Sequence, residues 1–474
     1  MKRFAIASVA ALAIFASSCA VGPKYVAPAM PAPPAYKEVD GWKTAQPADT
    51  KLRGDWWEMF GDAELNGLEQ QIDSSNQTLK IEVARFEQAR ALIKFNRAAK
   101  YPSVTIGTSV SANRYSANGA LASPADTVNY GDFALPLQIN YEVDAFGRIH
   151  HAIEAARNEA QATEADLETL RLSLHAELAY DYFELRSSDA EQKLLDDTVV
   201  AYTRALELTR NRYEGGATSG AEVAQAQTQL DATRTQDKDI GVQRAAYEHA
   251  IAVLLGKAPA ELSLNAKPLS IGPPDIPVGV PSQLLERRPD IAAAERRVAE
   301  ANAQVGIARA AYFPTILISA AVGLEGSSIT NWLAWPSRFW AVGPSVLQTV
   351  FDGGRRRANS EIAREGYDAT VAAYRQASLD AFQQVEDNLA ALRILDDEAG
   401  TQRAAVEAAE RSLDLSMNRY KGGIVTYLEV VTAQTVALEN ERTAVDIARR
   451  RMDASVSLIK ALGGGWDVSQ LPNV

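Results

Sequence analysis

The clearest pattern along the chain is an alternation of apolar and polar side chains in the segment 130–143. The apolar side chains fall at every second position: Phe133, Leu135, Leu137, Ile139, Tyr141 and Val143. A period of two is typical of a β-strand, because successive side chains point to opposite faces of a sheet. Weaker alternation predicts strands at 316–324 and 340–346, and 104–112 is a fourth and least clear candidate.

A second pattern, with apolar residues three and four positions apart, fills the two long regions without proline, 137–258 and 345–471. This spacing is that of a heptad seam, which is typical of helices that pack along their length. A helix from about 149 to 212 would be about 95 Å long. Shorter helices are predicted at about 76–100 and 289–312, and each ends near a proline, which lacks a backbone donor.

The chain also repeats itself. The segment "NRYEGGATSGAEVAQAQ" at 211–227 returns as "NRYKGGIVTYLEVVTAQ" at 418–434, with Glu222 and Glu429 in register 207 positions apart. This period is far longer than that of solenoid repeats. It predicts two similar halves, each with a helix, two strands and a long helical hairpin. The glycines allow each hairpin to reverse at its tip.

These patterns divide the chain into five parts. They are a signal peptide at 1–18, a lipidated tether at 19–50, a first half at 51–270 with its tip near 213–221, a second half at 271–464 with its tip near 420–427, and a C-terminal tail at 465–474.

The four predicted strands have the length and alternation of strands that cross a bilayer. Four strands cannot close a barrel, which needs about eight, and an open edge in lipid would leave backbone groups unpaired. The pattern therefore predicts a mixed α and β membrane protein that pools its strands. Three copies would form a trimeric twelve-stranded β-barrel, four strands per chain, continued by a long α-helical coiled-coil barrel. Strands of a soluble sandwich are the alternative, which leaves the long helices unexplained.

The N-terminus has the organisation of an export signal, with two basic residues, an apolar run and small residues before Cys19. We expect a covalent lipid on Cys19, because a lone cysteine after such a run is similar to a bacterial lipobox. The proline and alanine residues that follow suit an extended, unpacked tether, and 21–34 should be a tether only. No other cofactor is expected.

The formal net charge of −12 argues against nucleic acid as a partner, because nucleic acid requires a basic surface. An enzyme is not expected either, since neither an HExxH nor a GxSxG motif is present. His150 and His151 are adjacent, so they would leave a helix about 100° apart and would not converge on one metal. His175 and His249 are isolated in the sequence, and no metal site is expected.

Four kinds of segment carry a resemblance to a known family: "GDWWEMFGDAELNGLEQQ" at 54–71, "LLERRPDIAAAERRVAEANAQVGIARAAYFPTI" at 284–316, "VFDGGRRR" at 350–357 and the paired "NRYxGG" tips. They closely resemble outer membrane factors of the TolC/OprM type, especially the lipoproteins of the NodT family. The resemblance covers essentially the whole mature chain.

The resemblance implies the exit duct of a tripartite efflux pump, which lets small molecules pass passively from the periplasm to the exterior. It implies a homotrimer in the outer membrane of a Gram-negative bacterium, in contact with outer membrane lipid. A periplasmic adaptor and an inner-membrane transporter of the RND type are the implied partners. The alternative is a lipid-anchored periplasmic coiled-coil scaffold or adaptor without a channel.

The same resemblance assigns residues near the second tip to a periplasmic gate. Glu429 corresponds to the first of two acidic residues of the family gate, and Thr432 stands in place of the second. Tyr420 corresponds to a tyrosine that ties the inner hairpin to its neighbour, with Glu222 as its acidic partner. The bridging arginine of the family is Val425 here, so that part of the lock is missing or differently made.

We expect the adaptor to dock at the tips, where small residues and exposed backbone permit the close approach of another helical tip. The candidate residues are Arg212, Gly216, Ala217, Thr218, Ser219, Arg419, Gly423 and Ile424.

Overall fold

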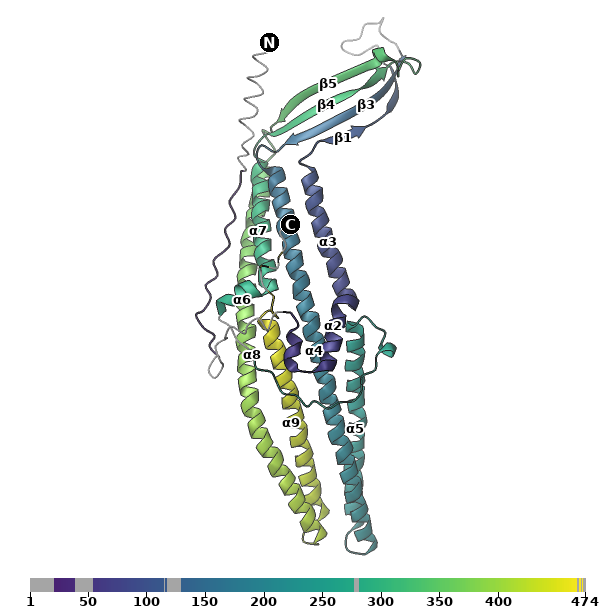
Figure 1. The fold of residues 1–474 in the computed structure, drawn as a ribbon, viewed down its shortest axis with the longest axis vertical. Coiled ribbons are helices and arrows are strands. Elements are labelled where there is room, and N and C mark those ends of the chain that lie inside the picture. The colour runs from purple at the N-terminus through teal and green to yellow at the C-terminus, as the bar shows by residue number, and fades with distance from the viewer. Residues whose placement is uncertain are drawn as a thin grey trace.

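The molecule is long, with a β-sheet at one end and the tips of two helical hairpins at the other (Figure 1). The computed structural model describes residues 21–38, 54–114, 116, 129–276, 281–466, 469 and 471. The predicted signal peptide and Cys19 lie outside the described residues.

Two helices of 67 residues run from the sheet to the tips, α4 (Arg148–Glu214) and α8 (Arg355–Lys421). Each is about 100 Å long at the rise of an α-helix. Each turns back into a helix of 35 residues, α5 (Gly220–Leu254) or α9 (Tyr427–Ala461). The long helix predicted from the heptad seam coincides with α4.

Two helices of 22 residues, α3 (Gln77–Ala98) and α7 (Pro289–Ala310), flank the upper parts of the long helices. Helix α3 packs on α4, whereas α7 packs on both α4 and α8. Both coincide with the shorter helices that the sequence predicts. None of the described helices combines the length and the apolar character needed to cross a membrane.

The sequence of each connection explains where the long helices begin. Asp144 accepts a hydrogen bond from the first turn of α4 at 2.9 Å, and Asp352 accepts one from the first turn of α8 at 3.2 Å. Such carboxylates satisfy N–H groups that have no partner within the helix. Gly147 and Gly354 directly precede the helices with φ of +80° and +92°, a conformation that favours glycine.

Short elements surround the middle of the molecule. They are the 3₁₀ helices η2 (Trp56–Phe60) and η3 (Pro259–Glu261) and the α-helices α2 (Ala63–Ser75) and α6 (Pro281–Arg287). The main hydrophobic core lies where η2 and α2 pack on the hairpins. Within it, the ring of Phe60 lies 4.9 Å from the ring of Phe183 on α4. A second, smaller core lies at the hairpin tips.

The strands form one antiparallel sheet. They are β1 (Ser103–Ile106), β2 (Ser109–Arg114), β3 (Asn129–Val143), β4 (Thr315–Gly326) and, after η4 (Trp335–Ser337), β5 (Arg338–Leu347). Strand β3 pairs with β1 and β2 on one side and with β4 on the other, and β4 also pairs with β5. The central pair, β3 and β4, therefore joins strands from the two halves of the sequence.

The fourth predicted strand, 104–112, is interrupted, which corrects the prediction of four continuous strands. Strands β1 and β2 pair with β3 in the same register before and after the gap. The gap falls opposite Pro136, which has no N–H to donate, although its carbonyl accepts a hydrogen bond from Gly107 at 3.1 Å. The described sheet thus has five strand segments in four strand positions.

Residues 21–38 do not form the unpacked tether that their composition predicts. The segment runs beside α7 and α8 (Figure 1). The side chain of Asn302 donates a hydrogen bond to the carbonyl oxygen of Pro23 at 3.1 Å, and Tyr36 is only 5% exposed within the main core. Proline favours an extended chain whether that chain is free or docked on helices, so composition alone did not distinguish the two.

Candidate functional site

One face of the sheet is apolar across all of its strand positions. Two adjacent rows across this face are Val104, Ile139, Ala320 and Val342, and Ile106, Leu137, Val322 and Trp340. Residues directly opposite each other share a face, so the observed register gathers the alternating apolar positions on one side. Trp340 and Val342 are 75% and 65% exposed. An apolar face this open needs an apolar environment to cover it.

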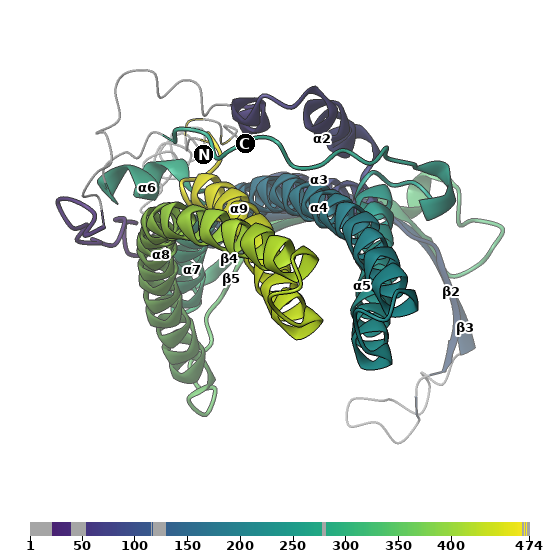
Figure 2. The ribbon, with the colours of Figure 1, turned by 90° about the horizontal axis from the view of Figure 1, so that it is seen from below.

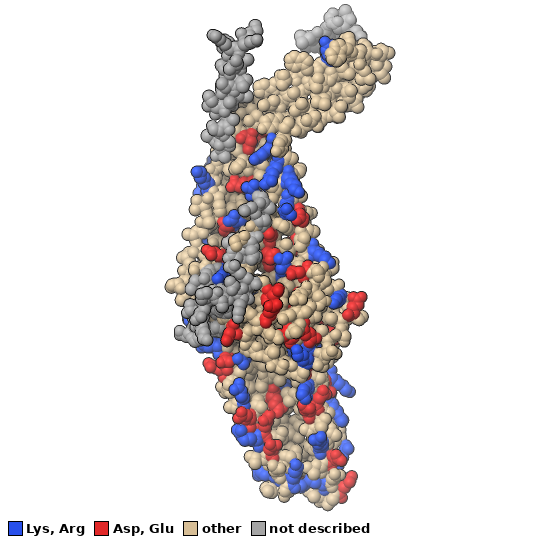
Figure 3. Space-filling view, viewed as in Figure 1, with Lys and Arg blue, Asp and Glu red and all other residues tan. Residues whose placement is uncertain are grey.

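The opposite face carries small and polar side chains. Two of its rows are Thr105, Gln138, Ala321 and Ala341, and Ser103, Asn140, Ser319 and Gly343. Lysine, arginine, aspartate and glutamate are almost absent from the part of the sheet visible in Figure 3, whereas they are common on the helices. A sheet with one apolar face and one polar face suits a boundary between lipid and water.

The sheet has two open edges, with β1 and β2 at one and β5 at the other. Seen along the long axis, the helices and the sheet lie along an arc that does not close on itself (Figure 2). An edge strand presents unpaired backbone groups that are a template for another strand. The described chain therefore forms an open, curved layer and not a closed barrel.

At the other end of the molecule, the two hairpin tips pack together through a small aromatic core. Tyr420 lies in the last turn of α8 and Tyr427 begins α9, and their ring centroids lie 5.2 Å apart. Both side chains are buried, and burial raises the pKa of Tyr427 to about 12. The hydroxyl of Tyr420 donates to the hydroxyl of Thr209 on α4 at 3.3 Å. Tyr420 thus joins the second tip to the first within one chain.

The predicted hydrogen bond between Tyr420 and Glu222 is not made within the described chain. The carboxylate of Glu222 accepts a hydrogen bond from the hydroxyl of Thr218 in its own tip. Glu222 lies in the first turn of α5, where the helix dipole favours a carboxylate. Tyr420 is instead turned into the tip core.

Arg212 reaches from the end of α4 to the second tip. Its guanidinium carbon lies 4.7 Å from the centroid of the Tyr420 ring, and its Nη1 donates to the carbonyl oxygen of Lys421 at 3.0 Å. The first is a cation–π contact, and the second is a hydrogen bond to a carbonyl at the C-terminus of α8, where carbonyls have no partner within the helix. A residue predicted for adaptor docking therefore also holds the two hairpins together.

The structure pairs a predicted gate residue with a predicted docking residue. Nη1 of Arg419 donates to Oε1 of Glu429 at 2.7 Å, with side chains 53% and 39% exposed. The hydroxyl of Thr432 donates to the carbonyl oxygen of Leu428 at 2.9 Å, and Val425 packs against the tip core. The carboxylate of Glu429 is therefore accompanied by a positive charge from its own hairpin.

The other docking candidates lie in the two loops between the hairpin helices. Gly216 and Gly423 have φ of +71° and +72°, the left-handed conformation that ends a helix before a reversal. The remaining candidates in these loops are Ala217, Thr218, Ser219 and Ile424. Ile424 is 71% exposed at the very tip of the second hairpin.

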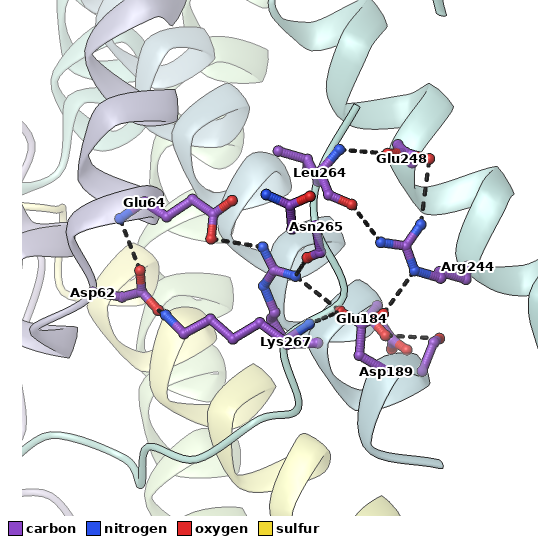
Figure 4. A network of polar contacts seen from close by, with 11 residues as sticks. Asp62, Glu64, Glu184, Asp189, Arg244, Glu248, Leu264, Asn265 and Lys267 are labelled. Carbon is purple, nitrogen blue, oxygen red and sulfur yellow. Dashed lines mark hydrogen bonds and ion pairs between the residues drawn. The ribbon is translucent and has the colours of Figure 1, made fainter. Parts of the chain in front are cut away.

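The sequence reasoning missed a buried charge network at mid-height (Figure 4). Its centre, which we call the buried clamp, consists of Arg186, Asp189 and Arg244. Asp189 accepts hydrogen bonds from both arginines, at 2.8 and 2.7 Å. The arginines in turn donate to the carbonyl oxygens of Asn265 at 2.8 Å and Leu264 at 2.6 Å. The clamp thereby fixes residues 262–269, which lead from the first half towards the second and which we call the connector, to α4 and α5.

A second missed cluster surrounds His175, which is isolated in the sequence but not in the fold. Its Nδ1 lies 2.7 Å from Oε2 of Glu69 on α2. Its ring stacks on that of Trp57, with the ring centroids 4.4 Å apart. Burial raises the pKa of Glu69 to about 7. Burial lowers the pKa of His175, but hydrogen bonds to Asp73 and Glu69 outweigh this effect, so the pKa is raised overall. The pair joins α2 to α4.

Long helices that end in a sheet with one apolar face and two open edges have the form expected of one part of a membrane channel. The sequence profile described as "Outer membrane efflux protein" matches residues 68–257 and 280–464. The chain belongs to this family of outer membrane efflux proteins.

Relatives and solved structures agree over nearly the whole chain. The outer membrane protein OprJ of Pseudomonas aeruginosa is 30% identical over 459 residues, which are 96% of this chain and 95% of OprJ. The toluene efflux pump outer membrane protein TtgF of Pseudomonas putida is 30% identical over 467 residues, 96% of each chain. The structure of the outer-membrane channel OprN matches with a TM-score of 0.87 at 30% identity, and covers 94% of this chain and 100% of OprN.

The family decides between the alternatives that the sequence left open. The protein is an outer membrane efflux channel, and the alternative of a periplasmic scaffold without a channel is not supported. The family is one of transport proteins and not of enzymes. The mixed fold, mostly helical with one small sheet, is that of the solved outer membrane channels.

Proposed function

We propose that three copies of the chain assemble into one duct, with a twelve-stranded barrel in the outer membrane and a helical barrel in the periplasm. The observation that carries this proposal is the sheet, which joins an apolar face to two open edges on an arc that does not close. In lipid, each unpaired backbone group at such an edge would cost several kcal/mol. Pairing of β5 from one copy with β1 and β2 of the next would remove both edges.

We further propose that each chain consists of two structural repeats, 51–270 and 271–464, with a tail at 465–474. Helices α4 and α8 have equal lengths, and so do α5 and α9 and α3 and α7. The first residues of α4 and α8 are 207 positions apart, as are those of α5 and α9. A trimer of such chains would place six similar hairpins around one axis.

The duct would carry small molecules passively from the periplasm to the exterior, as one part of a tripartite pump. Its tips would dock a periplasmic adaptor, and an inner-membrane transporter of the RND type would drive export. The exposed loops around Gly216 and Gly423 support docking at this end, because their small residues admit another helical tip closely, and Ile424 adds an exposed apolar side chain. The name of the relative TtgF as part of a toluene efflux pump is consistent with such an assembly.

A lipid on Cys19 would anchor the protein to the outer membrane of a Gram-negative bacterium. Residues 21–38 run beside α7 and α8 from the sheet end towards mid-height, which suits an anchor near the sheet.

The gate would lie at the tips, with Glu429, Thr432, Tyr420, Glu222 and Val425 nearest the constriction. The contacts of Tyr420 with Thr209 and Arg212 support a closed arrangement of the two hairpins. Arg212 would serve in place of the family's bridging arginine, which is Val425 here, because it ties α4 to the end of α8.

The test is conductance of the purified full-length protein in planar lipid bilayers, together with its mass in detergent. We expect discrete channel openings, heat-modifiable migration on gels and a mass of three chains. A water-soluble monomer without conductance would contradict the proposal.

A further inference from the structure

The buried clamp has a counterpart in the second half of the chain. Its three residues, Arg186, Asp189 and Arg244, recur 207 positions later as Arg393, Asp396 and Arg451. In both copies an arginine from the hairpin's second helix binds the aspartate of the first: Arg244 binds Asp189 at 2.7 Å, and Arg451 binds Asp396 at 2.6 Å. We call the second set the open clamp.

The two clamps are covered differently. In the buried clamp, Arg186 forms an ion pair with Glu64 of α2 at 2.8 Å, and the connector 262–269 lies over the site. Glu248 completes that cover, since it accepts a hydrogen bond from the N–H of Leu264 at 2.6 Å. The corresponding residue of the second half is Ser455, which has no carboxylate to offer.

At the open clamp, the N-terminal segment supplies the carboxylate that Glu64 supplies at the buried clamp. Nη2 of Arg393 donates to Glu38 at 2.6 Å. The N–H groups of Lys37 and Glu38 donate to the carboxylate of Glu386 on α8, at 2.6 and 3.0 Å. Tyr36 is buried in the main core just before them. Residues 36–38 therefore supply one buried ring, one carboxylate and two backbone donors.

We propose that Arg393 of the open clamp and Glu386 form a binding site for an extended peptide with an aromatic residue and a carboxylate, and that residues 36–38 of the same chain occupy it reversibly. The site holds the lower end of the N-terminal strap, which we define as residues 21–38. This proposal does not depend on the duct or on the trimer.

Reversibility follows from the exposure of the charges. Arg186 and Asp189 have side chains 2% and 1% exposed, so separating them would leave a charge unpaired in the interior. The side chains of Arg393 and Glu38 are 44% and 20% exposed, so water and salt reach the ion pair that holds the strap. The connector is thus held by a buried ion pair, whereas the charged contact at the lower end of the strap is one that salt weakens.

Hydrogen exchange of the full-length protein in detergent tests this difference. When the salt concentration rises from about 0.05 M to about 0.5 M, which shortens the screening length about threefold, the amides of Lys37 and Glu38 should exchange about two- to fivefold faster. That range is what loss of an exposed ion pair through salt screening would produce. The amides of Leu264 and Lys267, under the buried clamp, should not change over the same range.

Variants separate the site from a general effect of salt. Arg393→Gln should speed exchange at Lys37 and Glu38 to a similar extent at low salt, and Arg393→Lys should retain part of the protection. Arg403→Gln, at an exposed position further along α8, is the matched control and should change nothing. The proposal would be overturned if the exchange rates of the strap amides changed neither with salt nor with Arg393→Gln. It would also be overturned if the connector amides exchanged faster by the same factor as the strap amides.

Discussion

The ion pair between Arg419 and Glu429 changes what a ring of glutamates at the tip would do. Three unpaired carboxylates around an axis would favour cations. In each chain, however, Nη1 of Arg419 lies 2.7 Å from Oε1 of Glu429. We expect Glu429→Gln to lower the preference for cations and Arg419→Gln to raise it. Glu429→Ala should in addition raise the conductance of the closed channel, because it removes side-chain volume at the tip. The measurement is the reversal potential of single channels in a salt gradient.

A second exposed pair, on the helix that carries Arg419, provides the control. Glu407 and Arg411 lie on α8 away from the tip, and Oε2 of Glu407 is 3.8 Å from Nη1 of Arg411. Glu407→Gln and Arg411→Gln should leave the reversal potential unchanged. If Glu429→Gln also leaves it unchanged, Glu429 does not lie at the constriction.

The buried pair of Glu69 and His175 makes stability depend on pH. Burial raises the pKa of Glu69 from 4.5 to about 7, so the folded protein binds this proton more tightly than the unfolded chain does. Its contribution is therefore most favourable below pH 4.5 and declines by roughly 3 kcal/mol as the pH rises to about 7. The raised pKa of His175 acts in the same direction, since a protonated histidine also stabilises the fold.

We expect the thermal unfolding midpoint of wild type to fall between pH 5 and pH 8 by more than that of Glu69→Gln, because a glutamine cannot titrate. Glu407→Gln, at an exposed glutamate, should keep the slope of wild type. Equal slopes for wild type and Glu69→Gln would show that this pair does not titrate in the range.

At the residue scale, the sequence could suggest which residues matter at the tips, but it could not supply their contacts. Glu69 and His175 are 106 positions apart, and no periodicity links them. The charged residues of the buried clamp lie on heptad surfaces, where solvated charges are the normal case. Tyr420 was identified through the family resemblance, whereas nothing in the sequence pairs it with Thr209.

At the scale of elements, β3 and β4 approach each other closely at Gly323. A Cβ atom added to Gly323 would lie 2.3 Å from the carbonyl oxygen of Leu135 and 2.9 Å from the Cα of Pro136. Both atoms belong to the backbone, so β3 would have to move. We expect Gly323→Ala to cost about 1–3 kcal/mol and to reduce the fraction of protein with heat-modifiable migration on gels.

Gly343, on the neighbouring strand β5, is the matched control. An added Cβ atom meets nothing within 4 Å there, so Gly343→Ala should leave the folded fraction close to that of wild type. If both variants fold equally well, the pairing of β3 with β4 is looser than the register indicates.

The elements themselves were predictable where one periodicity extended over many residues. The seam of α4 and the prolines after α3 and α7 placed these helices to within two residues or so. The interruption between β1 and β2 could have been foreseen from Pro136, because a central strand cannot lose a donor without a local break. The short elements η2 and α2 could not, since they are held by contacts with α4 that lie far away in the sequence.

At the scale of the whole molecule, the shape of the chain makes sense only as part of a larger assembly. The 67-residue helices are far longer than any compact core is wide, and the sheet exposes Trp340 and Val342 on its apolar face. Lipid would cover that face, and neighbouring copies would cover the edges. The number of strands and the length of the helices allowed the sequence to predict that the chain must assemble with other copies. The sequence could not predict how the N-terminal strap lies on the helices.

The open edge formed by β1 and β2 allows the assembly to be tested without disturbing the chain's own sheet. The N–H of Gly107 donates to Pro136 and therefore points towards β3. Directions alternate along a strand, and the register continues unchanged into β2, so the N–H of Val110 points to the open edge. Proline is tolerated at such a position in an isolated edge strand, but it would remove a hydrogen bond to a strand of the next copy.

We therefore expect Val110→Pro to weaken or prevent the trimer, because the missing donor would leave a carbonyl of the neighbouring strand unpaired in lipid at a cost of several kcal/mol. Val110→Thr keeps the N–H and the branched shape, so it should assemble like wild type. The measurement is mass in detergent together with single-channel conductance. A stable, conducting trimer of Val110→Pro would mean that this edge does not receive a strand from a second copy, and the barrel would have to close in another way.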